Sequence, residues 1–275
     1  MTALALAFAS GVSWGVADFF GGLKARQLPV LNVLLASQGT GLLLVTIYML
    51  IRWEPVPGGD FALWAVLSGV AGVIGLSAFY RGLSIGNMGV VAPISATAAV
   101  IPVAVGIASG DRPAGLQYMG LVLALAGVVL ASREEVTGGA VRGAGFALVS
   151  AVGFGFFFVG MDHASDADIG WAMLGNRITS FSLLLAAFAV LRPPLAARRR
   201  DAPVLAMVGT LDITANGLFA IASTEGLVSL VSVLGSLYPL TTVLLAALVL
   251  RERPHRIAQI GVAMALGGVV LIAAG

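Results

Sequence analysis

Asp212 and Asn216 stand four residues apart in an otherwise apolar stretch, so a helix would place both side chains on one face. A carboxylate in apolar surroundings needs either a positively charged partner or a bound proton. Arg177, which follows Asn176 in another apolar stretch, is a candidate partner. This chemistry suits contact with a polar solute or the carrying of a proton. The alternative is an Asp212–Arg177 ion pair that only fastens two helices together.

Trp14 and Asp18 have the same spacing of four residues near the start of the chain. On a helix they would share a face, where an aromatic ring and a carboxylate could line one wall of a cavity. The alternative is that Asp18 lies at the membrane surface and pairs locally with Lys24 or Arg26.

Several weaker candidates accompany these residues. Arg81, beside Tyr80, either guides an anionic solute or extends to lipid headgroups. Gln38 lies between Ser37 and Thr40, whose hydroxyls usually bond to their own helix. The predicted set of cavity or coupling residues is Trp14, Asp18, Gln38, Tyr80, Phe154, Asn176, Arg177, Asp212, Asn216 and Tyr238.

Signatures of enzymes and cofactor sites are sparse. The chain has no H-E-x-x-H motif, no phosphate-loop Gly-Lys-Ser/Thr and no cysteine. Its two histidines, His163 and His255, fall in connecting segments. We therefore expect no enzymatic activity, no metal, no cofactor and no direct use of ATP. A proton carried by Asp212 or Asp18 is the candidate coupling ion.

The elements that position these residues are apolar runs of about 20 residues, each long enough to cross about 30 Å of hydrocarbon. Only 10% of the 275 residues are charged and 59% are hydrophobic, whereas about 25% are charged in soluble domains. The first run lacks a basic leading segment and is interpreted as a retained helix. The ten runs are 3–22, 31–51, 61–83, 88–108, 114–132, 142–160, 170–191, 203–224, 227–250 and 256–274.

The chain contains an internal repeat. Residues 112–130 match residues 253–271 at nine positions, and a shift of 140 aligns Trp14 with Phe154. We therefore predict an all-α, multi-pass protein of the plasma (inner) membrane, with ten transmembrane helices in two five-helix repeats, 1–137 and 138–275. Because five is odd, the second repeat must be inverted. The cavity between halves should be lined mainly by the first, third, fourth, sixth, eighth and ninth helices.

The order of several short motifs resembles an EamA-type member of the drug/metabolite transporter superfamily. The motifs are Ser10-Gly11-x-x-Trp14-Gly15, Tyr80-Arg81-Gly82-Leu83 with Gly86, the prolines Pro102 and Tyr238-Pro239, and Arg251 to Pro254. The resemblance covers the whole chain and implies export or exchange of amino acids, nucleobases or other small metabolites. The first repeat departs from the family pattern, because Asp111-Arg112-Pro113 stands where Glu before Pro is frequent.

Three prolines, Pro93, Pro102 and Pro239, interrupt the predicted fourth and ninth helices, which occupy equivalent places in the two repeats. Proline bends a membrane helix and frees a backbone carbonyl. Paired bends of this kind suit a rocking gate, and static packing kinks are the alternative.

Basic residues predict the orientation. Odd-numbered connections hold twelve Lys or Arg and even-numbered ones hold only Arg52 and Arg112, which places the odd connections in the cytoplasm and both termini outside. The family resemblance favours termini inside.

Together these features predict a transporter of small organic solutes, working by alternating access as an exporter or exchanger and as a monomer or homodimer. Its partners are a small-molecule substrate and the lipid bilayer, with no nucleic acid. The competing class is a membrane-embedded structural or assembly protein.

Overall fold

The computed structural model of the protein describes residues 2–86, 88–131, 143–249 and 256–275. Every regular element in these ranges is a helix, as expected where lipid offers the backbone no hydrogen-bond partner. The elements are α1 (Thr2–Ala25), α2 (Val30–Arg52), α3 (Phe61–Ile85), α4 (Met88–Ala96), η1 (Thr97–Ala99), α5 (Val100–Ser109), α6 (Gly115–Ala131), α7 (Ala144–Ser165), α8 (Ile169–Leu191), η2 (Arg199–Asp201), α9 (Ala202–Glu225), α10 (Val228–Gly235), α11 (Tyr238–Val249) and α12 (Arg256–Ala274).

The predicted all-α class is confirmed for the described residues, and each of the ten predicted runs overlaps a helical stretch. Six stretches are long and apolar enough to cross a membrane: α1, α2, α3, α7, α8 and the segment Arg199–Glu225. The remaining four, Ile94–Ser109, Gly115–Gly127, Val228–Thr242 and Gln259–Ile272, are shorter apolar helices. The count of ten transmembrane helices therefore stays a prediction.

Some predicted features lie outside the described residues. They are the repeat boundary between 137 and 138, the Arg251 to Pro254 motif, and the basic residues Arg133, Arg142, Arg251 and Arg253.

The predicted fourth and ninth helices are each interrupted near the middle. In the first half, α4 and α5 are joined by the 3-10 turn η1. In the second half, α10 and α11 are separated by the two residues Ser236 and Leu237. Pro102 and Pro239 fall in the first turns of α5 and α11, where a missing N–H costs little, and Pro93 lies within α4. The interruptions lie at positions that the 140-residue shift relates.

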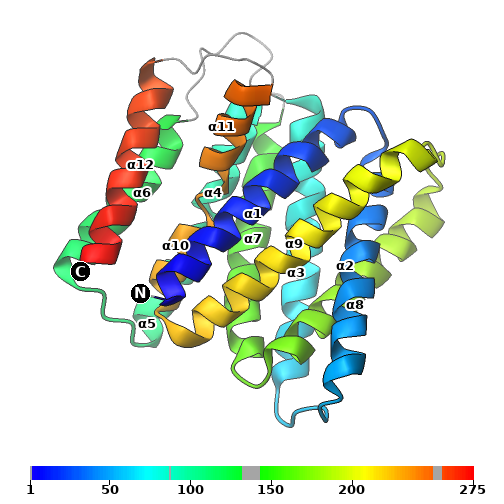
Figure 1. Cartoon of the computed structure of the whole chain (residues 1–275), viewed down its shortest axis with the longest axis horizontal. Helices are drawn as coiled ribbons and strands as arrows, with labels where there is room; N and C mark the ends of the chain where they lie inside the picture. The colour runs from blue at the N-terminus through cyan, green and yellow to red at the C-terminus, as the bar shows by residue number, and fades with distance from the viewer. Residues whose placement is uncertain (1, 87, 132–142, 250–255) are drawn as a thin grey trace.

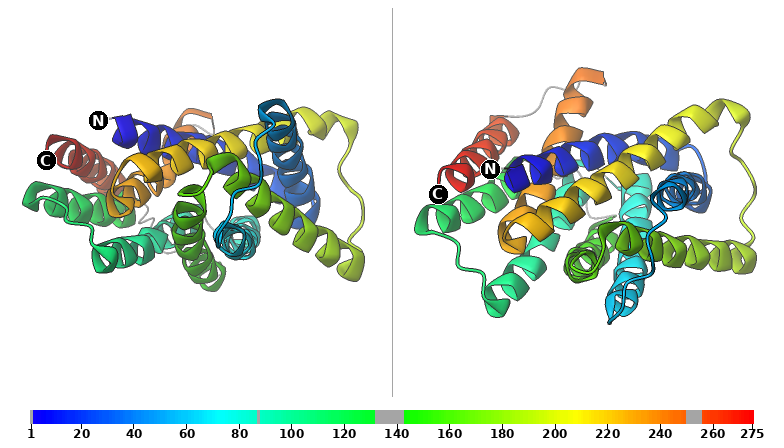
Figure 2. Two further views of the ribbon diagram at one scale, coloured as in Figure 1. Left: turned by 90° about the horizontal axis from the view of Figure 1, so that it is seen from below. Right: turned by 60° about the horizontal axis from the view of Figure 1, so that its bottom comes forward.

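The third long helix of each half packs against the first and second long helices of the other half. α3 packs against α7 and α9 packs against α1, while α3 also contacts α8 and α9 also contacts α2. The repeat relates α1 to α7, α2 to α8 and α3 to α9, so each contact has a counterpart with the halves exchanged. α6 and α12 pack chiefly on each other and form a pair at one side of the molecule (Figures 1 and 2). Both termini lie at the left in Figure 1.

Glycines that the repeat aligns make equivalent close contacts. A Cβ atom on Gly15 would collide with the carbonyl oxygen of Tyr238, and one on Gly155 would collide with that of Ala98. The same shift of 140 residues relates the two glycines and the two carbonyls. Such small residues let membrane helices approach closely, where lipid gives no hydrophobic drive for helix association.

One glycine contact gives a test of this packing. Gly153 of α7 lies against the backbone of Gly75 in α3, so Gly153→Ala should lower the free energy of unfolding by about 1–3 kcal/mol. Gly145→Ala, also in α7, adds a methyl where no atom lies within 4 Å and should be neutral or stabilising. Thermal unfolding of both variants in detergent measures the difference. Equal stabilities would contradict the close α3–α7 contact.

Candidate functional site

A cavity with an empty volume of about 550 Å³ lies among the middle segments of seven helices. Nine of the ten predicted cavity residues line it, and the tenth, Tyr80, is buried beside Asp18. The lining residues are Trp14 and Asp18 of α1, Gln38 of α2, Gly72, Val73 and Leu76 of α3, Phe154, Phe157 and Phe158 of α7, Asn176, Arg177 and Ser180 of α8, Asp212 and Asn216 of α9, and Tyr238 of α11.

The helices that build the cavity differ in part from the prediction. The predicted fourth helix, present as α4 and α5, contributes none of the described lining residues. The second and seventh predicted helices, α2 and α8, contribute Gln38 and Arg177. The other five predicted helices do line the cavity. The second and seventh join them because the buried Arg177 of α8 takes polar partners from α2 and α9.

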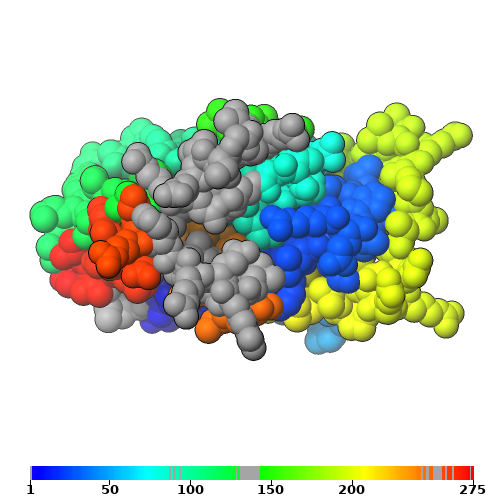
Figure 3. All heavy atoms as spheres, turned by 90° about the horizontal axis from the view of Figure 1, so that it is seen from above, coloured from blue at the N-terminus to red at the C-terminus, as the bar shows by residue number. Residues whose placement is uncertain are grey.

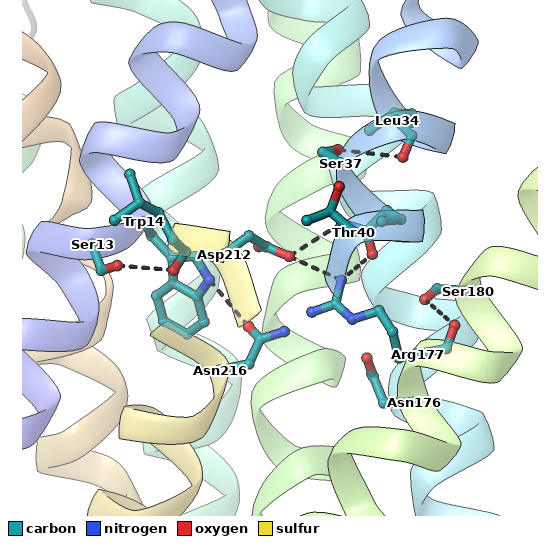
Figure 4. Close-up of polar contacts among 12 residues, drawn as sticks. Ser13, Trp14, Leu34, Ser37, Thr40, Asn176, Arg177, Ser180, Asp212 and Asn216 are labelled. Atoms are coloured by element: carbon teal, nitrogen blue, oxygen red, sulfur yellow. Dashed lines mark hydrogen bonds and ion pairs between the residues drawn. The ribbon is translucent and has the colours of Figure 1, made fainter. Parts of the chain in front are cut away.

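Arg177 is the centre of a buried polar network (Figure 4). Its Nη1 donates to Oδ2 of Asp212 at 2.9 Å and also to Oε1 of Gln38. Gln38 Nε2 donates to the same Asp212 oxygen at 3.2 Å. The predicted Asp212–Arg177 ion pair is therefore present, with side chains only 14% and 2% exposed. This network joins α2, α8 and α9.

A second set of hydrogen bonds joins α1 to α9. Trp14 donates its indole N–H to Oδ1 of Asn216 at 3.1 Å. Ser10 and Ser13 donate to the carbonyls of Ala215 and Leu211, each at 2.8 Å. Trp14 is thereby held at the cavity wall, with its ring centroid 5.6 Å from that of Phe158.

Asp18 differs from Asp212 because it forms no ion pair with any described residue. Tyr80 is its hydrogen-bonding neighbour, and the nearest charge is the like-charged Asp212. The alternative of a local pair with Lys24 or Arg26 is not realised. Lys24 pairs with Asp201 at 2.7 Å, and Arg26 donates to the carbonyl of Leu83.

The weaker candidates separate into two groups. Arg81 is exposed, which fits a side chain that extends to headgroups. Ser37 and Thr40 donate to carbonyls of their own helix, at 3.3 and 2.9 Å. Of the cluster on α2, only Gln38 reaches the cavity.

Phe157 and Phe158 also line the cavity, although neither is in the predicted set of cavity residues. They are 7% and 3% exposed, whereas Phe156 is 55% exposed. One signal was available, because the 140-residue shift pairs Phe158 with Asp18. Gly72, Val73, Leu76 and Ser180 were also missed, and no polar residue or motif distinguishes them from their neighbours in the sequence.

A G-x-S-x-G pattern, typical of hydrolase nucleophiles, does occur at Gly82 to Gly86. Its Ser84 lies in the last turn of α3 and donates to the carbonyl of Arg81. His163 contacts Trp64, which lies twenty residues before Ser84 in the same helix. At 1.5 Å per residue, about 30 Å of helix separates Ser84 from the neighbourhood of His163. The pattern therefore lacks the strand-to-helix turn that the chemistry needs, and His163 lies too far away to assist Ser84. Among the described residues, no group of three or more histidines and carboxylates could hold a metal.

A second group of acidic residues lines a separate cavity near the start of α10. Asp111, Asp162 and Asp166 face it together with His163. Asp111 accepts the backbone N–H of Ser229 at 3.0 Å. A residue from the first half thus caps a helix of the second, at the end favoured for negative charge.

Comparison with known proteins identifies a family and solved structures with a similar fold. The family model described as "EamA-like transporter family" matches residues 1–133 and again residues 141–274. A solved structure described only as "Crystal structure of protein" is similar with a TM-score of 0.76 and 16% identity, over 98% of this chain and 95% of that one. At this identity the likeness shows the fold alone. No curated protein sequence matches the chain.

Proposed function

The chain belongs to the EamA-like transporter family, and from that premise we propose that it moves small organic solutes through the cavity around Arg177. The observation that carries this proposal is the cavity itself, in which a buried cation, two carboxylates and an aromatic wall surround an empty volume of about 550 Å³. Intramembrane ionisable residues are costly and typically mark solute or ion pathways.

We further propose ten transmembrane helices in two inverted repeats, 1–137 and 138–275. The two separate family matches, the exchanged helix pairs and the matched glycine contacts support this division. In inverted-repeat transporters the site lies near the midplane between the repeats, and one repeat rocks against the other. The interruptions between α4 and α5 and between α10 and α11 are the proposed hinges.

The proposed mode is export or exchange by alternating access in the plasma (inner) membrane, driven by a solute or proton gradient. Figure 3 views the end of the molecule where α1 ends and α2 begins. A structural or assembly protein without transport activity is the competing class. It gains no support from the family match or from a charged cavity.

Transport by proteoliposomes tests the proposal. Purified protein should release or take up members of a panel of radiolabelled amino acids, nucleobases and organic acids, and protein-free vesicles should not. Gly72→Leu, which fills the cavity against Phe157, should abolish this transport. Gly115→Leu, placed where no atom lies within 4 Å, should leave it unchanged. A folded protein that passes none of the panel would favour the competing class.

Orientation has its own test, because the native chain has no cysteine. The charge distribution predicts that a single cysteine at exposed Arg199 is shielded from an impermeant thiol reagent in intact cells, whereas one at exposed Glu54 is labelled rapidly. Permeabilised cells should label both. The reverse pattern in intact cells would overturn the orientation and leave the fold untouched.

A further inference from the structure

Two side chains that line the cavity, those of Arg177 and Asn216, carry hydrogen-bond donors that have no acceptor among the described residues. Arg177 uses Nη1 for Asp212 and Gln38, whereas its buried Nη2 and Nε atoms have no partner. The Nε atom faces Gly41 of α2. The Nη2 atom, also buried, points toward Asn216 (Figure 4).

The second side chain is that of Asn216, whose donor is the amide nitrogen Nδ2. The indole nitrogen of Trp14 can only donate, so the Asn216 atom 3.1 Å from it must be the oxygen. The Nδ2 group therefore faces away from Trp14 and points toward Arg177 (Figure 4). Two donors from different helices thus face each other across a cavity that both residues line.

Such an arrangement lacks an acceptor between the donors. A buried N–H group without a partner is costly, and a guanidinium forms its strongest hydrogen bonds with carboxylates. Arginine offers donors along more than one edge, so Asp212 can occupy Nη1 while a second carboxylate occupies Nη2. The walls around this position are apolar, formed by Trp14, Phe157 and Phe158 on one side and by Val73 and Leu76 of α3.

We propose that Arg177 Nη2 and Asn216 Nδ2 form a carboxylate-binding site, and that the solutes of this protein are small organic carboxylates with an apolar body. The inference rests on the proposed function for its biological role. The binding site itself stands on the geometry of the two donors.

Equilibrium binding to purified protein in detergent tests the site without any need for transport. The probe is tritiated 3-phenylpropionate, measured by scintillation proximity, with 3-phenylpropanamide and 3-phenylpropylamine as competitors. We expect the carboxylate to bind at least tenfold more tightly than the amide, which has the same shape without the charge. The amine should compete no better than the amide.

Asn216→Asp is the informative variant, because its carboxylate still accepts the Trp14 N–H but replaces the donor with a negative charge. It should weaken 3-phenylpropionate binding at least tenfold and leave amide binding unchanged. Thr224→Asp, at an exposed position in the last turn of the same helix, is the matched control and should not change the preference.

Equal affinity for carboxylate and amide would overturn the proposal, as would an unaffected Asn216→Asp variant that unfolds at the wild-type temperature. Absence of measurable 3-phenylpropionate binding would overturn it as well. Transport of other solutes in proteoliposomes would then leave the proposed function intact. Conversely, specific binding without transport of any solute would retain the site and reject the transporter.

Discussion

Replacing Asp212 with asparagine should lower the free energy of unfolding by about 3–5 kcal/mol, because it leaves the buried guanidinium of Arg177 without its counter-charge. Arg177 is only 2% exposed, and its remaining partner, Gln38, is neutral. Thermal unfolding in detergent, followed by size-exclusion chromatography, measures the loss. The expected result is a lower unfolding temperature and a smaller monodisperse fraction.

The second variant of the pair distinguishes a charge effect from a packing effect. Adding Arg177→Leu to Asp212→Asn removes the unpaired cation and leaves Gln38 able to bond the new amide. The double variant should recover most of the lost stability. If the double variant is as unstable as the single one, the pair does not account for the loss. The double variant should also fail to bind 3-phenylpropionate, which separates stability from the proposed site.

Asp18→Asn is expected to abolish accumulation of solute driven by a pH gradient, reducing the accumulation ratio from proteoliposomes to about 1 while exchange at equilibrium persists. The reason is that Asp212 already has a cation, whereas Asp18 is buried beside Tyr80 and has no ion pair with a described residue. Of the two carboxylates in the cavity, Asp18 is therefore the better candidate proton carrier. The measurement is uptake with and without an imposed pH gradient.

Its control is Asp166→Asn, which removes an exposed carboxylate at the far end of α7. That variant should retain gradient-driven accumulation. An Asp18→Asn protein that still accumulates solute in response to the gradient would exclude Asp18 as the coupling group. Loss of exchange as well as accumulation would indicate a role in solute binding instead.

The sequence predicts the helices better than it predicts their faces. Long apolar runs bounded by charged or Pro-containing connections mark α1, α2 and α3 within a few residues. Charged and amide residues inside such runs also identified part of the cavity, because a buried charge or amide needs a cavity or a partner. The residues found in this way are Asp18, Gln38, Asn176, Arg177, Asp212 and Asn216. The Asp212–Arg177 pair was predictable for the same reason, since Arg177 is the one basic residue that falls in the middle of an apolar run.

Apolar contributors to the cavity could not be predicted in this way. Phe156 faces outward while Phe157 and Phe158 face the cavity, and the three are chemically identical. In a soluble protein a polar face would show which side of a helix is buried. Lipid tails are as apolar as a protein core, so that signal is missing here. The interruption between α10 and α11 was likewise only partly visible, because Pro239 marks its end and nothing marks Ser236.

The two interrupted helices differ in local shape although the repeat makes them equivalent. One half bridges its interruption with the 3-10 turn Thr97–Ala99, and the other with the residues Ser236 and Leu237. The molecule therefore contains two conformations of one structural motif. If the halves exchange these conformations, the cavity opens to the opposite face. This change uses only backbone conformations that the molecule already contains. In the proposed inverted-repeat arrangement, the two end states would be related by the axis that relates the halves, and would have similar energies unless the solute or a bound proton distinguishes them.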